Sequence, residues 1–327
     1  MMSMCARSMS TMSKLSIIVP VYYNEETLEL LYADLKEKVI KKIDEYEIVM
    51  VDDGSEDHSW FIMMNIAKMD PNVKLIKLSR NFGSHAAILA GLERCTGNCA
   101  VIKAADLQED SELLLEMYES WKKGNNVVLA ARKDREEGKT QKFFATLYYK
   151  MVRKFISAKM PEGGFDIFLI DRKVIEVLKL LDEKNSAITL QVLWSGFQTD
   201  VIYYVRRERK VGKSRWTIAK KIKLVIDSLL GFSYLPIRFM TAVGSVCFFG
   251  SLVWSVVLFI QKLVIGIPIQ GWTTLMIMLL LTSGLIMLML GILGEYIWRC
   301  LDASRKRPPY IIERELHIED ERENKYF

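Results

Sequence analysis

The sequence is poor in the residues that build metal clusters and disulfide frameworks. Its 327 residues include five cysteines, with no CxxC pair, and three histidines that lie far apart. This pattern disfavours zinc and favours scattered reduced thiols in a cytosolic compartment. The sequence also has neither a GxGxxG nor a GxxxxGK(S/T) motif. A dinucleotide-binding Rossmann site and a P-loop are therefore disfavoured, and a bound phosphate would need a metal ion and basic side chains.

The chain lacks an apolar run near its start, and its net charge is modest. Residues 1–14 are rich in Met and Ser, so we expect a flexible segment without a signal peptide and a cytosolic N-terminal domain. The formal net charge is +5, and most of the basic surplus lies at 206–223 and 299–307, on either side of an apolar region. This placement favours a membrane surface or a phosphate partner over nucleic acid.

Short apolar runs alternate with segments of helical spacing in the first half of the chain. The runs lie at 15–21, 47–51, 73–78, 100–102 and 127–130. This alternation predicts an α/β fold in which helices cover both faces of a mostly parallel sheet. Ligands of such sheets bind beyond the carboxyl ends of the strands.

Polar and turn-forming residues follow four of these runs, at 22–25, 52–55, 79–83 and 106–108. Two of the four segments are acidic, one with Asp52 and Asp53 and the other with Asp106. Carboxylates at two strand ends of one sheet predict a single crevice that binds a nucleotide and its metal ion.

Two long apolar runs lie in the second half of the chain. Phe239–Gln261 has 23 residues and Trp272–Leu293 has 22, and neither contains a charged residue. As helices they would be about 33 Å long, enough to cross a hydrocarbon core, so we expect a two-helix transmembrane hairpin rather than buried soluble helices. Basic residues lie before the first run and after the second, while the tip has only Lys262. Both ends are therefore expected in the cytoplasm.

The segment Thr217–Leu230 precedes the first apolar run. Its apolar residues recur at helical spacing and its lysines fall largely on another face, which favours a helix lying at the membrane surface. An ordinary core-facing helix with a solvated lysine face remains the alternative.

Four motifs together resemble a known family. They are SIIVPVYYNE at Ser16–Glu25, VDDGSED at Val51–Asp57, LSRNFG at Leu78–Gly83 and ADLQ at Ala105–Gln108. The combination resembles family 2 glycosyltransferases of the GT-A fold, in particular polyprenyl-phosphate sugar transferases related to dolichol-phosphate mannose synthase and bactoprenol glucosyltransferase. The resemblance extends through Arg209–Trp216 to Gly294–Tyr296 and covers nearly the whole chain.

The resemblance implies roles for individual residues. The nucleotide pocket would be formed by Pro20, Tyr22, Glu25, Asp52, Asp53 and Arg80. Catalysis would involve Asp106, Gln108 and Asp166, with Asp106 and Gln108 also holding Mg²⁺ or Mn²⁺ at the diphosphate. Alternatives stay open, because Asp52 or Asp53 could cap the following helix and Gln108 could be a turn residue. Gly163–Asp166 is expected to form a turn near the sugar.

The metal motif departs from the pattern of many relatives. They carry Asp-Ala-Asp-Leu-Gln, whereas this chain has Ala104 in the first position. Asp106 and Gln108 would then complete the coordination shell with diphosphate oxygens and water, because magnesium usually keeps several waters. The departure also motivates an alternative, a non-catalytic nucleotide-sugar-binding scaffold.

Basic residues outline the acceptor side. A lipid phosphate is already anionic, so it needs positioning and charge shielding but no general base. The candidates for this task are Arg132, Arg135, Lys142, Arg209, Lys213 and the hydroxyl of Ser214.

The expected protein is an inverting membrane glycosyltransferase that moves a sugar from a nucleotide sugar to a polyprenyl phosphate. The resemblance implies uracil as the base of the nucleotide. The other enzyme considered is a processive polysaccharide synthase, but the segment Gln191–Ser195 lacks its Gln-x-x-Arg-Trp motif.

The expected partners are the nucleotide sugar, the polyprenyl phosphate and the bilayer, with a homo-oligomer left open and no nucleic acid. The expected regions are a flexible N-terminus (1–14), a catalytic domain (15–216), an interfacial helix region (217–237), two spans (238–298) and a charged cytoplasmic tail (299–327).

Overall fold

The computed structural model describes residues 13–133, 148–154, 156–181, 187–205, 235–265 and 271–317, together with Thr146, Ser228 and Phe232. The chain divides into two compact units, one formed by residues 1–220 and 308–327 and the other by residues 221–307. The expected interfacial helix Thr217–Leu230 lies outside the described residues except for Ser228. Each unit is described separately below.

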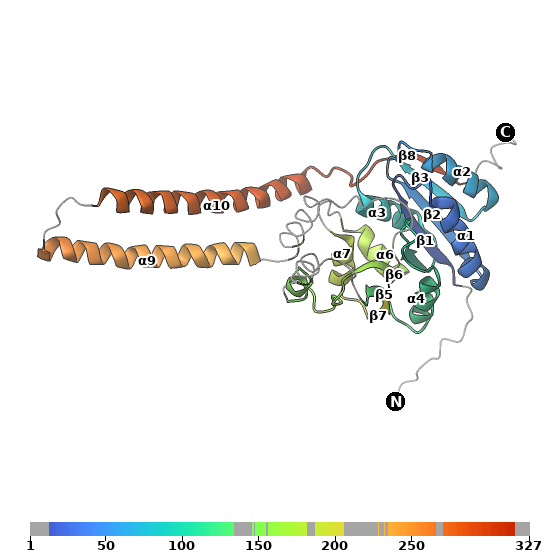
Figure 1. Ribbon diagram of the computed structural model, residues 1–327, viewed down its shortest axis with the longest axis horizontal. Helices are drawn as coiled ribbons and strands as arrows, with labels where there is room; N and C mark the ends of the chain where they lie inside the picture. Colours follow the sequence, from blue (N-terminus) through green and yellow to red (C-terminus); the bar gives the residue numbers. More distant parts are fainter. Residues whose placement is uncertain are drawn as a thin grey trace, which may run out of the picture. The chain divides into compact units, whose positions relative to one another are not determined.

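The first unit is a mixed α/β domain built on one eight-stranded sheet (Figure 1). Its strands are β1 (Leu15–Val21), β2 (Tyr46–Asp52), β3 (Val73–Leu78), β4 (Cys99–Ile102), β5 (Val127–Arg132), β6 (Phe165–Asp171), β7 (Thr199–Tyr204) and β8 (Ile312–Leu316). Its helices are α1 (Leu28–Lys38), the short 3₁₀ helix η1 (Ile40–Lys42), α2 (Ser59–Met69), α3 (Ser84–Arg94), α4 (Glu112–Lys122), α6 (Arg172–Lys179) and α7 (Ile188–Trp194).

The strand order is β7-β5-β6-β4-β1-β2-β3-β8. Pairing is parallel between β1 and β2, β1 and β4, β2 and β3, and β5 and β7. The prediction of a mostly parallel sheet is therefore confirmed, and the five predicted strands are all present. Three antiparallel pairs were not predicted: β4–β6, β5–β6 and β3–β8.

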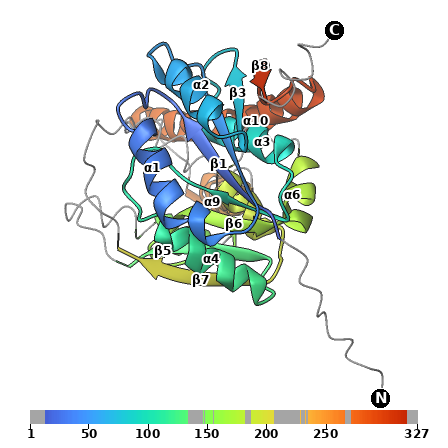
Figure 2. The ribbon, with the colours of Figure 1, turned by 90° about the vertical axis from the view of Figure 1, so that its right-hand side faces the viewer.

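Helices cover both faces of this sheet, as the alternating pattern predicted. Alternate residues of the strands pack with α1, α2 and α4 in one buried cluster. Helix α3 lies on the opposite face, where Gly91 approaches Ile18 so closely that an added Cβ would clash with Ile18 Cγ2. Figure 2 views the domain with α1 and α4 in front of the central strands. The central strands are thus buried on both sides, which explains their nearly continuous apolar runs.

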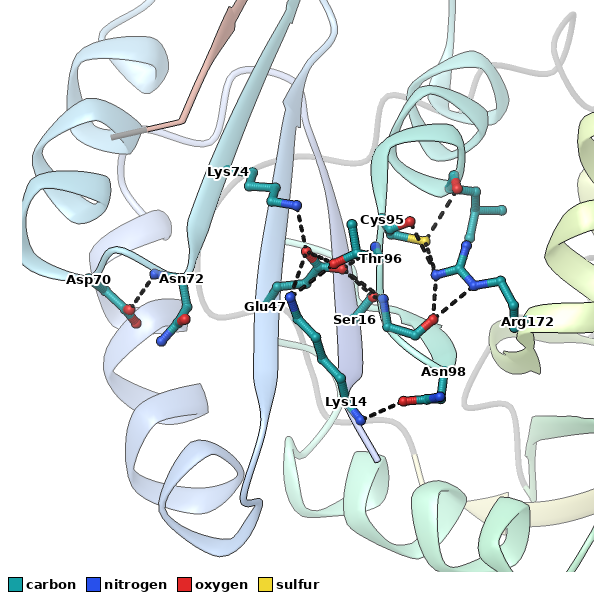
Figure 3. Close-up of polar contacts among 12 residues, drawn as sticks. Lys14, Ser16, Glu47, Asp70, Asn72, Lys74, Cys95, Thr96, Asn98 and Arg172 are labelled. Carbon is teal, nitrogen blue, oxygen red and sulfur yellow. Dashed lines mark hydrogen bonds and ion pairs between the residues drawn. The ribbon is translucent and has the colours of Figure 1, made fainter. Parts of the chain in front are cut away.

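A buried carboxylate ties together the amino ends of the central strands (Figure 3). Glu47, 1% exposed, accepts hydrogen bonds from Ser16 Oγ at 2.6 Å and Gly97 N at 3.0 Å, and its Oε2 lies 2.9 Å from Lys74 Nζ. Burial opposes its ionisation, but the bonds from Ser16, Lys74 and Thr96 outweigh burial and lower the pKa of Glu47 to about 2. This network lies at the end of the sheet away from the predicted crevice.

The second unit contains two long helices, α9 (Leu235–Ile265) and α10 (Trp272–Ser304). They include both predicted apolar runs, so the helical conformation of those runs is as predicted. Among the described residues, one stretch, Leu281–Ser304, is long and apolar enough to cross a membrane, and a shorter apolar helical stretch covers Ile237–Cys247. This stretch overlaps the second predicted run, and the two-helix transmembrane hairpin stays a prediction.

The expected C-terminal tail contains structure that the sequence did not predict. Helix α10 continues to Ser304, and β8 pairs antiparallel with β3 at the edge of the sheet. Arg94 Nε lies 3.1 Å from Glu315 Oε2 and links α3 to this strand. Residues 308–327 of the expected tail thereby belong to the first unit, while residues 299–307 belong to the second.

Candidate active site

The predicted polar segments gather at one edge of the sheet, which we call the rim. In the parallel registers Val21 lies opposite Asp52, and Asp52 lies opposite Lys77, so the carboxyl ends of β1, β2 and β3 are level. The carboxyl ends of β4 and β5 and the amino end of β6 lie on the same side, because β6 is antiparallel to both neighbours. The rim therefore carries candidates from both the donor and the acceptor sets.

The loops after β1 and β2 are hydrogen-bonded to each other. Tyr23 N donates to Ser55 Oγ at 3.0 Å, and His58 N donates to Glu25 Oε2 at 2.8 Å. Tyr23 takes a left-handed backbone conformation with φ 54°, and its ring meets that of Tyr22 edge to face at 4.7 Å. Glu25, which was predicted to line the nucleotide pocket, thus also connects the two loops. Tyr22 and Pro20 are half-buried at the end of β1.

Asp52 is fully buried, and among the described residues only one of its carboxylate oxygens has a hydrogen-bond partner. Oδ1 accepts a hydrogen bond from Ser55 N at 3.0 Å, whereas Oδ2 has no hydrogen-bond partner within the described part of the chain. Burial raises the pKa of Asp52 above its usual value, against the opposing bonds from Ser55. A buried acceptor without a donor is costly, so this oxygen fits a donor group on a ligand.

Asp53 has a different role. Its two oxygens accept from Phe82 N at 2.7 Å and Gly83 N at 2.9 Å, so its carboxylate holds the loop after β3. Burial raises the pKa of Asp53, and these two bonds oppose the rise. Gly54 allows the loops after β2 and β3 to approach closely, because a Cβ on it would stand 2.6 Å from the carbonyl carbon of Arg80. The predicted nucleotide-binding role of Asp53 stays a prediction.

Neither acidic residue caps the following helix. Helix α2 begins at Ser59, whose N–H donates instead to Asp57 Oδ1 at 3.1 Å. The capping alternative for Asp52 and Asp53 is thus wrong. Arg80, on the loop held by Asp53, is exposed, and its guanidinium lies 4.2 Å from the ring centroid of Phe82.

Asp106 and Gln108 are brought together by a tight turn after β4. Gln108 N donates to Asp106 Oδ1 at 3.3 Å, and the intervening Leu107 has φ 56°. The backbone N–H of Gln108 thus bonds to Asp106, and the predicted metal role of the Gln108 side chain stays a prediction. Within the described ranges, no group of three or more His, Cys, Asp or Glu residues could hold a metal ion. Magnesium is commonly bound by one or two carboxylates with substrate phosphates and water, so these two residues fit a partial ligand set.

Arg132 and Asp166 form an ion pair on the other side of the rim. The side chain of Arg132 is 11% exposed and that of Asp166 is 52% exposed. Asp166 lies within β6 rather than in the expected turn, which is confined to the residues before it. The structure thus joins one acceptor candidate to one catalytic candidate. The remaining acceptor candidates lie outside the described residues: Arg135, Lys142, Arg209, Lys213 and Ser214.

Two buried polar residues near these elements were not assigned from the sequence. Lys103 is 0% exposed directly after β4, and Gln191 on α7 is 1% exposed. Neither amide atom of Gln191 has a hydrogen-bond partner in the part of the chain that the structure describes. The sequence gives no signal for the burial of Lys103, because lysine is ordinarily exposed unless it is paired.

The fold and the rim define a mixed α/β protein of GT-A-like architecture, and its sequence matches the family model for glycosyl transferase family 2 over residues 16–179. Glycosyltransferase YkcC of Bacillus subtilis is 37% identical, across 96% of this chain and 98% of that protein. The bactoprenol glucosyl transferase of Shigella phage SfV is 35% identical, across 92% of this chain and 99% of that protein. The chain therefore belongs to glycosyl transferase family 2 and is a transferase.

Solved structures are more distant. Mannosyltransferase PcManGT from Pyrobaculum calidifontis, in complex with GDP-Man and Mn²⁺, is 18% identical with a TM-score of 0.46, over 65% of this chain and 61% of that chain. Residues 1–349 of S. aureus TarS, in complex with UDP-GlcNAc, are 18% identical with a TM-score of 0.46, over 67% of this chain and 67% of that chain. At this sequence identity and TM-score, the solved structures support no conclusion about the site.

Proposed function

We propose that this transferase moves a sugar from a nucleoside-diphosphate sugar, with uridine as the expected base, to a polyprenyl phosphate at the cytoplasmic face of a membrane. The observation that carries the proposal is the full-length match to a protein named bactoprenol glucosyl transferase, across 99% of that protein. The match includes the rim and the apolar helices together. A membrane-bound acceptor explains why both occur in one chain.

The proposal includes two membrane spans, formed by α9 and α10. Support comes from their lengths of 31 and 33 residues, since about 20 apolar helical residues suffice to cross a bilayer. The distribution of basic residues around the two helices predicts that the first unit and the C-terminal residues lie in the cytoplasm. This arrangement also brings β8, which follows α10, back to the cytoplasmic domain without a further crossing.

On the donor side, Asp52 would bind the base or ribose through its buried Oδ2, and Asp53 would orient the loop of Arg80. Asp106 and Gln108 would hold a divalent cation at the diphosphate. When bound, such a cation neutralises the charge that develops on the departing nucleoside diphosphate. The turn that joins Asp106 and Gln108 would fix the direction from which the diphosphate is held.

On the acceptor side, an oxygen of the lipid phosphate forms a bond to the anomeric carbon of the sugar. The bond from that carbon to the nucleoside diphosphate breaks, and the diphosphate leaves with the electron pair. No proton needs to move, because the attacking phosphate is already anionic. A single displacement of this kind inverts the anomeric configuration. Arg132 would shield the acceptor's charge, and its pair with Asp166 would set its direction.

The test is turnover by the purified full-length protein with a panel of nucleotide sugars and a polyprenyl phosphate, with the lipid product detected by mass spectrometry. We expect a lipid-linked sugar from at least one donor, and none from Asp106→Asn. Donor binding without turnover under all conditions would instead support the nucleotide-sugar-binding scaffold that Ala104 suggests. A polymer of sugars would support a processive synthase.

A further inference from the structure

A buried ion pair spans the loop that carries Asp106 and Gln108. Lys103 Nζ donates to the backbone carbonyl of Glu109 at 2.6 Å and lies 3.7 Å from Glu109 Oε2. Lys103 is 0% exposed and Glu109 is 3% exposed. The lysine side chain therefore bridges the first and last residues of the loop, with both metal candidates between them.

The pair is costly to bury, because both charges leave water. Burial lowers the pKa of Lys103 below its usual value, and the carboxylates of Glu109 and Asp106 oppose this shift. Replacing a buried ion pair by apolar residues of similar size is commonly neutral or stabilising. Stability alone therefore gives no strong reason for charges here, whereas a fixed loop shape does.

The far end of the same loop is held by a second, more exposed contact. Lys38 of α1 lies 2.9 Å from Asp110 Oδ1 and 2.7 Å from Asp34 Oδ1. This contact fixes the residue after Glu109 to α1, so the buried pair bridges a loop whose end is already anchored. The left-handed backbone of Leu107 also helps to determine where Asp106 and Gln108 stand.

We propose that Lys103, through Glu109, is the positioning residue of this site: it holds Asp106 and Gln108 in the arrangement that lets a divalent cation and a diphosphate bind together. The inference rests on the proposed function. It gives a reason why one carboxylate could suffice where Ala104 replaces the first acidic residue. Mg²⁺ demands near-ideal geometry, so a partial ligand set depends strongly on a fixed loop.

Two variants separate positioning from stability. Lys103→Met alone leaves Glu109 buried without its partner and should lower the thermal stability of the protein. The double variant Lys103→Met/Glu109→Met removes both charges and should recover most of that stability. If the pair positions the loop, the double variant should still bind Mn²⁺ at least about tenfold more weakly in the presence of UDP.

Binding is measured on the full-length protein by electron paramagnetic resonance of free Mn²⁺ at saturating UDP, so the readout does not depend on turnover. The control is Lys42→Met, which removes the same charge from an exposed ion pair with Glu112 and should leave Mn²⁺ binding unchanged. Wild-type Mn²⁺ affinity in a stable double variant would overturn the positioning role while leaving the proposed function intact. Absence of Mn²⁺ binding by the wild type, at any UDP concentration, would overturn the metal assignment and this inference with it.

Discussion

Replacing Glu47 by Gln should strongly destabilise the first unit without touching the rim. A folded-state pKa of about 2, against 4.5 in the unfolded chain, corresponds to about 3 kcal/mol of stability at neutral pH. Breaking a buried ion pair typically costs about 3–5 kcal/mol. The partners Lys14 and Lys74 are 31% and 21% exposed, so solvent screening favours the lower end of that range.

Thermal unfolding of the detergent-solubilised full-length protein measures this loss. At about 2–4 °C per kcal/mol for a unit of this size, Glu47→Gln should lower the midpoint by about 6–12 °C. The matched control is Glu45→Gln, an exposed carboxylate on the same segment, which should change the midpoint by less than about 2 °C.

The pH dependence gives a second check. Because folding lowers the pKa of Glu47, its contribution is fully present above the unfolded pKa of 4.5 and is lost as pH falls toward about 2. The difference between wild type and Glu47→Gln should therefore shrink steadily between pH 5 and pH 3. Equal midpoints at pH 7, or a difference that does not change across this range, would refute the assigned role of the network.

Three further predictions concern the rim. Asp106→Asn should lower sugar transfer by at least about 100-fold while leaving the unfolding midpoint unchanged, and near-wild-type turnover in saturating Mg²⁺ or Mn²⁺ would contradict its role. Asp52→Asn should weaken donor binding at least about tenfold by equilibrium titration yet keep or raise stability, because it removes a buried charge whose Oδ2 has no partner among the described residues. Gly54→Ala should cost about 2 kcal/mol or more and weaken donor binding, since its φ is 70° and its Cβ would meet Arg80; an unchanged midpoint would count against this.

The strands that the sequence predicted are those buried on both faces, where almost every residue is apolar. Of the three strands it missed, β6 (FDIFLID) is also apolar and buried, whereas β7 and β8 are less regular. In β8 the sequence IEREL is largely charged, and as an edge strand it keeps one side toward solvent. In β7 most residues are only half-buried, so no alternating pattern stands out. Such strands depend on partners that are distant in the chain, and local pattern does not contain that information.

The same limit applies to the candidate site. The sequence grouped Asp52 and Asp53 as neighbours in one acidic cluster, but adjacent residues at a strand end point in different directions. Asp52 has a buried oxygen with no partner in the described part of the chain, and Asp53 holds the loop after β3. Likewise, Lys103 lies three residues before Asp106, and only the fold reveals that it reaches Glu109. Motifs identify the residue types, while backbone contacts determine which of them can meet a ligand.

The most direct test of the central proposal is the balance of products in a reaction of purified protein, nucleotide sugar and polyprenyl phosphate. The lipid mass should increase by one sugar residue with no added phosphate, and one nucleoside diphosphate should be released for each lipid product. Release of a nucleoside monophosphate with a lipid diphosphate would contradict the proposed displacement at the anomeric carbon. Nucleoside diphosphate release with no change in lipid mass would contradict the proposed acceptor.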